Sequence, residues 1–82
     1  MKRYILRNIA TRDGKDFFAW YSGKQYGIPT KLTGDNMTRD LRYATVLLDD
    51  TAAGPVSPQA IKAACEAITA GQPITWELQE HN

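Results

Sequence analysis

Few side chains in this sequence have the type and spacing that enzyme chemistry requires. The chain has one histidine, His81, which stands next to the C-terminal residue, and one cysteine, Cys65. A Ser/His/Asp set needs a histidine inside the fold, whereas a terminal histidine usually lies on a frayed end. A single cysteine also excludes an internal disulfide and a thiolate zinc cluster. We therefore expect no catalytic triad.

Two other features could suggest chemistry, the thiol of Cys65 and the adjacent carboxylates of Asp49 and Asp50. Cys65 falls on the apolar stripe of a predicted helix, where a thiol behaves as a small buried hydrophobic group. Neighbouring residues of a strand point to opposite faces, so Asp49 and Asp50 do not converge on one metal ion. The glycines match neither a P-loop nor a dinucleotide fingerprint. The sequence predicts a protein that is not an enzyme, with no catalytic residue, metal or cofactor.

The remaining candidate function is the binding of a partner. The residue types suited to it are most frequent in DFFAWYSGKQYG, residues 16–27, which holds five of the eight aromatic residues. Aromatic residues interleaved with arginines are enriched at the centres of protein interfaces. They also form stacking platforms for single-stranded nucleic acid. The candidate partner-binding residues are Phe18, Trp20, Arg7, Arg3, Lys24 and Tyr26.

A β-hairpin is predicted to position these side chains. Strand-forming segments at residues 2–10 and 16–23 flank Asp13-Gly14, a dipeptide that tolerates the positive φ angles of a type I′ turn. The resulting register pairs Arg12 with Lys15, Ile9 with Phe18, Arg7 with Trp20 and Ile5 with Ser22.

Alternation of side chains gives the hairpin two unlike faces. One face is uncharged and is expected to form the core beneath a helix, together with Ile74, Trp76 and Leu78; its members are Tyr4, Leu6, Asn8, Ala10, Phe17, Ala19 and Tyr21. The opposite face carries Phe18 and Trp20 among Arg3, Arg7 and Lys24, and we expect Arg7 to stack on Trp20. The alternative is that residues 24–40 fold back over Phe18 and Trp20, using Tyr26, Ile28, Leu32 and Met37.

The middle of the chain gives weaker signals. Residues 24–40 are predicted to be a long connecting loop because glycines and a proline break any periodicity, and a short strand from Ile28 to Leu32 is one interpretation. Residues 41–49 fit either a helix or a strand. We favour a turn over Asp40–Ala44 followed by a strand over Thr45–Asp49.

The end of the chain predicts one helix and one strand. Ser57 is a good N-cap, Pro58 suits the first helical position and Gly71 stops a helix over residues 58–70. Its apolar stripe is Ile61, Ala64, Cys65 and Ile68. Alternation of Ile74, Trp76 and Leu78 indicates a closing strand.

The elements together predict a single domain, residues 1–82, of the α+β class. A three- to four-stranded, mainly antiparallel sheet has one amphipathic helix packed on one face, in the order β-hairpin, long loop, strand, helix, strand.

Composition and charge limit the classes of partner that we expect. No apolar run approaches the roughly 20 residues of a membrane span, so no membrane partner is expected, and we expect a cytoplasmic protein. The net charge of +1 does not favour a dedicated nucleic-acid binder. Residues 1–42 hold nine Lys/Arg and four Asp/Glu (+5), whereas residues 43–82 hold one Lys and five acids (−4).

Several short motifs occur in a fixed order: KRYILR at Lys2 to Arg7, the Asp13-Gly14 turn, an aromatic strand, DLRYA at Asp40 to Ala44, an alanine-rich helix and a closing strand. In this layout the chain resembles small accessory proteins encoded by phages and prophages. It departs from them in the Gly/Pro-rich loop and in DDTAAGPVS before the helix. The resemblance implies an accessory or host-interaction role and no particular catalytic residue.

Two functions follow as expectations. The first is a non-catalytic protein-binding module, and the resemblance implies a phage-type accessory protein or an inhibitor of a host defence complex. A homodimer sealed by the same face is a version of this hypothesis. The alternative is a small nucleic-acid-binding accessory protein that uses the basic aromatic face of the hairpin.

Overall fold

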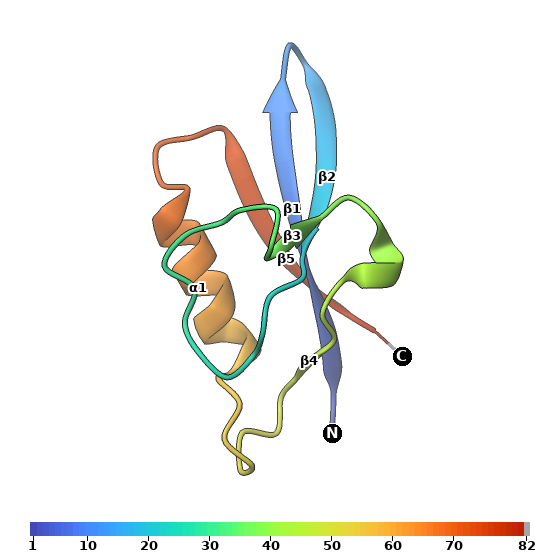
Figure 1. Ribbon diagram of the computed structural model, residues 1–82. Helices are drawn as coiled ribbons and strands as arrows, with labels where there is room; N and C mark the ends of the chain where they lie inside the picture. Colours follow the sequence, from blue (N-terminus) through green and yellow to red (C-terminus); the bar gives the residue numbers. More distant parts are fainter. Residues whose placement is uncertain (82) are drawn as a thin grey trace.

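The structure, a computed structural model, describes residues 1–81 and confirms the predicted α+β fold, in which one helix packs against a curled antiparallel sheet (Figure 1). Five strands, one α-helix and one short 3-10 helix follow each other along the chain. They are β1 Arg3–Arg12, β2 Lys15–Tyr21, β3 Met37–Thr38, η1 Leu41–Tyr43, β4 Leu47–Leu48, α1 Pro58–Ile68 and β5 Ile74–Glu80.

Strand β1 is the centre of the sheet. Along one edge it pairs with β5, from Tyr4↔Glu80 to Ala10↔Ile74. The other edge is shared, because β2 pairs with the second half of β1 and β4 pairs with its first residues. Strand β3 extends the sheet beyond β2, and every pairing is antiparallel.

The predicted hairpin forms with the predicted register over most of its length. Asp13 (φ 52°) and Gly14 (φ 74°) both adopt the positive φ angles of the two-residue turn. The pairs Arg12↔Lys15, Ile9↔Phe18 and Arg7↔Trp20 are confirmed. The predicted Ile5–Ser22 pair is wrong, because β2 ends at Tyr21 and β4 takes over that edge of β1 through Tyr4↔Leu47.

Helix α1 begins at the predicted signals and ends slightly before the predicted stop. The Ser57 side chain accepts a hydrogen bond from the Ala60 N–H (3.2 Å), and Pro58 occupies the first turn. The helix ends at Ile68, two residues earlier than predicted. There the Thr69 hydroxyl donates to the Cys65 carbonyl (2.9 Å) and accepts from Trp76 Nε1 (2.9 Å), which ties the end of α1 to β5.

The core lies between α1 and the sheet. Its buried members are Leu6, Tyr21, Leu47, Ile61, Cys65 and Trp76, and the partly buried residues packed against them are Tyr4, Leu32, Met37, Val56, Ile74 and Leu78. Most of the predicted core positions on β1, β2 and β5 are therefore confirmed, whereas Ala10 and Ala19 are only partly buried and Phe17 is exposed.

Phe17 is the predicted core residue that is exposed, at 47%. The eleven residues of α1 make a helix about 16 Å long, whereas the ten residues of β1 span about 33 Å. Figure 1 shows the distal half of the hairpin extending past the end of α1. Phe17 faces the side of the sheet that we predicted, but the helix does not reach it.

The connection from residue 24 to residue 40 does not fold over Phe18 and Trp20. Leu32 and Met37 pack against the core, on the side of the sheet that α1 covers. The only strand in this connection is β3 at Met37–Thr38, so the strand considered at Ile28–Leu32 is wrong. After β3, the predicted turn appears as η1, whose N-cap is Asp40. The predicted strand appears as β4, which is shorter than expected.

Gln25 holds this connection in place. Its Nε2 donates to the carbonyls of Leu48 (2.6 Å) and Val56 (2.9 Å), and its Oε1 accepts from the Leu48 N–H (2.9 Å). The Val56 N–H in turn donates to the Gln25 carbonyl (2.7 Å). A buried glutamine thus joins the loop to β4 and to the segment before α1, and both polar atoms of its side chain are used.

No helix within residues 1–81 has the length and apolar character needed to cross a bilayer.

Candidate functional site

The candidate interface is the face of the sheet turned away from α1, which we call the reverse face. Register and alternation place nine residues of three strands on it: Arg3, Ile5, Arg7, Ile9, Phe18, Trp20, Thr75, Glu77 and Gln79. Four of the six predicted partner-binding residues belong to this set.

Arg7 is held at the centre of the reverse face. Its Nη2 lies 3.3 and 3.4 Å from the two carboxylate oxygens of Glu77, which is its cross-strand partner on β5. Its Cζ lies 4.7 Å from the centroid of the Phe18 ring. The guanidinium is therefore fixed between a carboxylate and an aromatic ring, a favourable arrangement for a cation.

The predicted stacking of Arg7 on Trp20 is wrong. Trp20 lies directly across from Arg7 in the β1–β2 register, whereas Phe18 is the diagonal neighbour. A long arginine side chain reaches the diagonal position as easily as the direct one. In the structure the guanidinium lies over the diagonal ring, and Phe18, 43% exposed, is the accessible aromatic residue of this face.

Trp20 itself is partly buried. Its indole Nε1 is excluded from solvent and has no hydrogen-bond partner among the described residues. Residues 39–46, which we call the arch, leave the sheet where Thr38 pairs with Trp20 and return where the Thr45 N–H donates to the Tyr21 carbonyl (2.9 Å). Trp20 thus stands where the arch begins and ends, and it is not the freely exposed residue that the sequence predicted.

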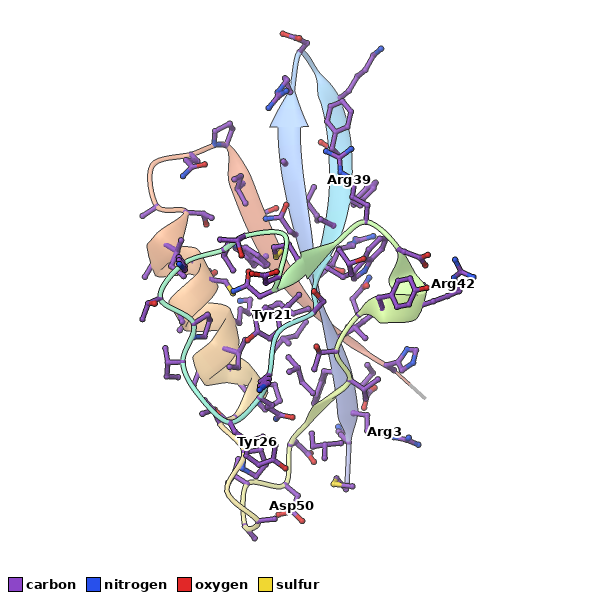
Figure 2. All side chains as sticks on the ribbon, in the orientation of Figure 1. Arg3, Tyr21, Tyr26, Arg39, Arg42 and Asp50 are labelled. Carbon is purple, nitrogen blue, oxygen red and sulfur yellow. The ribbon has the colours of Figure 1, made fainter. Side chains whose placement is uncertain are left out.

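The arch presents side chains that sequence reasoning did not select. Leu41 is 50% exposed and Tyr43 is 67% exposed. Between them Arg42 pairs with Asp40 (Nη2 to Oδ2, 2.6 Å) and lies 5.7 Å from the Tyr43 ring centroid. Figure 2 shows Arg42 projecting away from α1. This pair lowers the pKa of the Asp40 carboxyl, because the Arg42 side chain donates hydrogen bonds to the charged form.

The remaining predicted residues divide between two places. Arg3 is exposed on the reverse face at the start of β1. Lys24 and Tyr26 instead line a shallow groove of about 550 Å³ together with Ile28 and Pro29. In Figure 2, Tyr26 lies at the lower end of the molecule below Tyr21. Lys24 and Tyr26 therefore do not join Phe18 in one site, because Gln25, the residue between them, binds the loop on the helix side.

The groups considered for catalysis have structural partners. Cys65 is fully buried in the core, and burial raises the pKa of its thiol to about 11. The Asp49 carboxylate accepts from the Lys2 N–H (2.9 Å) and the Asp50 carboxylate accepts from the Ala52 N–H (3.0 Å). Within residues 1–81, no three His, Cys, Asp or Glu side chains gather closely enough to hold a metal ion.

Comparison with known protein families, curated proteins and solved structures finds no match to this chain. Function is therefore inferred from the geometry of the chain's own residues.

Proposed function

We propose that this protein is a non-catalytic protein-binding module that docks through the reverse face and the arch. The observation that carries the proposal is the Arg7 guanidinium, fixed between Glu77 and the exposed ring of Phe18. Arginine and aromatic residues are the types most enriched at interface hot spots.

Preorganisation supports a binding role for this surface. An arginine already held by a carboxylate and a ring loses little further side-chain freedom when a partner arrives. The neighbouring arch adds exposed apolar surface at Leu41 and Tyr43. Asp40 caps its turn by accepting from the Arg42 N–H (3.0 Å), and the bond from Thr45 to Tyr21 ties its end to β2. A partner would cover apolar area around an ordered charge, which is the usual anatomy of a protein interface.

The resemblance of the sequence to phage accessory proteins suggests what kind of partner this surface would bind. A small protein without a catalytic site of its own would act by occupying a surface of a larger host complex, such as a defence complex. A second copy of the chain is the other protein partner that this surface could accept.

The nucleic-acid alternative receives less support on this face. Arg7 is paired with Glu77 and Arg42 with Asp40, so two of the four arginines of the reverse face and arch already have a carboxylate. Phosphate binding relies on cations that release counterions, and a cation with its own acid contributes little.

The proposal predicts that partner capture depends on Phe18 and not on Tyr26. Wild-type protein, Phe18→Ser and Tyr26→Ser are used as baits in the same host lysate, and captured proteins are quantified by mass spectrometry. A protein recovered with wild type and with Tyr26→Ser, and reduced at least about tenfold with Phe18→Ser, is expected from the loss of one central aromatic contact.

The two baits form a matched pair, because both changes remove an exposed aromatic ring and only one ring belongs to the reverse face. Raising the salt concentration separates partner classes, since apolar contacts survive it and phosphate contacts weaken steeply. Sedimentation of the purified protein at rising concentration shows whether the partner is a second copy. Equal capture by all three baits would contradict the proposal.

A further inference from the structure

A second recessed surface lies on the helix side of the sheet, beyond the end of α1. It is a pocket of about 410 Å³ between the distal half of the hairpin and the turn that joins α1 to β5. This volume lies within the range of small-molecule sites. The lining residues are Ala10, Thr11, Arg12, Phe17, Arg39, Gln72, Pro73 and Ile74.

The pocket exists because the helix is shorter than the strands. Ala10 pairs with Phe17 on β2 and with Ile74 on β5, and these three residues form its apolar part. Arg39 directly follows β3, whose register puts it opposite Ala19 and so on the same face as Phe17. Figure 2 shows Arg39 beside the upper half of the hairpin, far from Arg3 and Tyr26 at the lower end.

The two arginines of this pocket, Arg12 and Arg39, hold no carboxylate of the described chain, in contrast to Arg7 and Arg42. None of the ion pairs or side-chain hydrogen bonds within residues 1–81 involves the guanidinium of Arg12 or of Arg39. No acidic residue lines the pocket. Lys15, across from Arg12 in the hairpin register, adds a third positive charge at its margin. Among the residues that the structure describes, the pocket is therefore lined by two arginines without an ion-pair partner and by no carboxylate.

An aromatic ring completes the arrangement. Phe17 is 47% exposed and lines the same pocket as Arg12 and Arg39. A half-exposed ring offers a face on which a planar group can stack, and two guanidinium groups can share one phosphate through paired N–H donors. A simple anion would use only the arginines and would leave the ring in water.

We propose that this pocket binds a nucleotide, with its phosphate between Arg12 and Arg39 and its base against Phe17. Such a ligand matches the positive charge and the apolar ring at the same time. The pocket lies on the opposite side of the sheet from the reverse face and shares only Arg39 with the arch, so this proposal does not depend on the protein-binding function. The nucleotide can be a free molecule or the phosphorylated end of a single strand.

The test is a titration of isotope-labelled protein with AMP, adenosine and inorganic phosphate at about 50 mM salt, where phosphate contacts are weakly screened. AMP is expected to shift the amide signals of Thr11, Phe17 and Gln72 and to bind more tightly than either fragment. Arg12→Gln and Arg39→Gln should each weaken AMP binding about tenfold, the loss expected for one charge-assisted contact, and should leave adenosine binding unchanged.

Two further variants control the interpretation. Phe17→Leu keeps an apolar side chain and should weaken AMP and adenosine by similar factors, about tenfold, because it removes only the stacking face. Lys31→Gln makes the same charge change on an exposed loop residue outside the pocket and should leave all three affinities unchanged. Circular dichroism establishes that each variant is folded before it is titrated.

Several results would overturn the assignment. These are no shift at millimolar AMP, AMP binding no tighter than inorganic phosphate, or tighter binding of O-phosphotyrosine than of AMP. Titration with a 5′-phosphorylated thymidine tetranucleotide distinguishes a free nucleotide from the phosphorylated end of a single strand. Tighter binding than AMP, with the same dependence on both arginines, supports a strand end, and equal binding supports a free nucleotide.

Discussion

The thiol of Cys65 and the phenol of Tyr21 lie in the same core, and both resist ionisation. Burial raises the pKa of the thiol from its ordinary value of 9.0 to about 11. Burial also raises the pKa of Tyr21 above its ordinary value of 10.0, and the charge of an ionised Cys65 would raise it further. Both groups are neutral when protonated, so folding favours the protonated form of each.

This predicts a loss of stability at alkaline pH that begins with Cys65. Between pH 9 and pH 10 the unfolded chain releases the thiol proton while the folded chain retains it, so the unfolded chain binds fewer protons. The free energy of unfolding should fall by on the order of 1 kcal/mol over this interval, and below pH 9 the stabilisation is fully present. Urea unfolding followed at several pH values measures the change.

Cys65→Ala is the control for this prediction. The variant loses packing and is less stable at every pH, but its stability should depend less on pH between 9 and 10. Above pH 10 the contribution of Tyr21 remains in both proteins and has the same sign. An unchanged pH dependence in Cys65→Ala would contradict the assignment to the thiol.

Single-residue contacts were the least predictable feature of the candidate site. The sequence correctly placed Arg7 and Phe18 on one face, because alternation along a strand decides that. It did not predict which ring Arg7 would contact, since the guanidinium is also held by Glu77, 70 positions away in the chain. The sequence places Lys24 on the face with Phe18, whereas the structure places Lys24 in a separate groove with Tyr26, because the path of this loop depends on the buried bonds of Gln25.

At the scale of elements, the join between β2 and the following loop depends on Gly23. A Cβ atom there would stand 2.5 Å from the Tyr21 hydroxyl oxygen and 2.6 Å from its Cζ. Tyr21 has no room to move, because it is 2% exposed and its hydroxyl donates to the Lys24 carbonyl (2.8 Å). The absence of a side chain lets the loop cross close against this ring.

Gly23→Ala should therefore destabilise the protein by about 1–3 kcal/mol, the usual cost of overpacking a filled core. Gly27→Ala is the matched control in the same loop, because a Cβ atom at Gly27 meets no atom within 4 Å. Chemical denaturation of both variants beside the wild type measures the difference. Equal midpoints for the two variants would contradict the proposed contact.

Elements with a local signal were predicted well, and elements that depend on distant pairing were not. Asp13-Gly14 defined the hairpin register, and Ser57 and Pro58 defined the start of α1, because turn and cap chemistry act over a few residues. Strand β3 has only two residues and no periodicity of its own. Met37 and Thr38 are extended because Trp20 and Tyr21 offer an open edge to pair with.

At the scale of the whole molecule, β1 holds the sheet together. It pairs with β5 along one edge and with β2 and β4 along the other, so it loses its hydrogen bonds only when the entire sheet opens. The amides of residues 7–10, bonded on both sides of the strand, should be the slowest to exchange with deuterium. Backbone amides in the loop at residues 26–35 should exchange at least about 100-fold faster.

Hydrogen exchange read by NMR tests this ranking, and amides of α1 that outlast those of β1 would contradict it. The order of the amide exchange rates depends on how the whole sheet assembles, and the sequence indicates that assembly only in part. The difference in length between α1 and β1 is a second property that the sequence indicates only in part. Alternation places Phe17 on the correct face of the sheet but does not show how far the helix extends. The nucleotide pocket occupies the strip of sheet that this mismatch leaves uncovered.

The pairing of β1 with β5 also determines how the fold responds to mechanical force. The His81 N–H donates to the Arg3 carbonyl (2.8 Å), so the outer ends of these two antiparallel strands lie side by side. Tension applied between these two ends would load the rungs of the ladder one after another, as in unzipping, and never all together. A threading motor that pulls on the outer end of β5 would therefore meet low resistance and would remove β5 before the central strand.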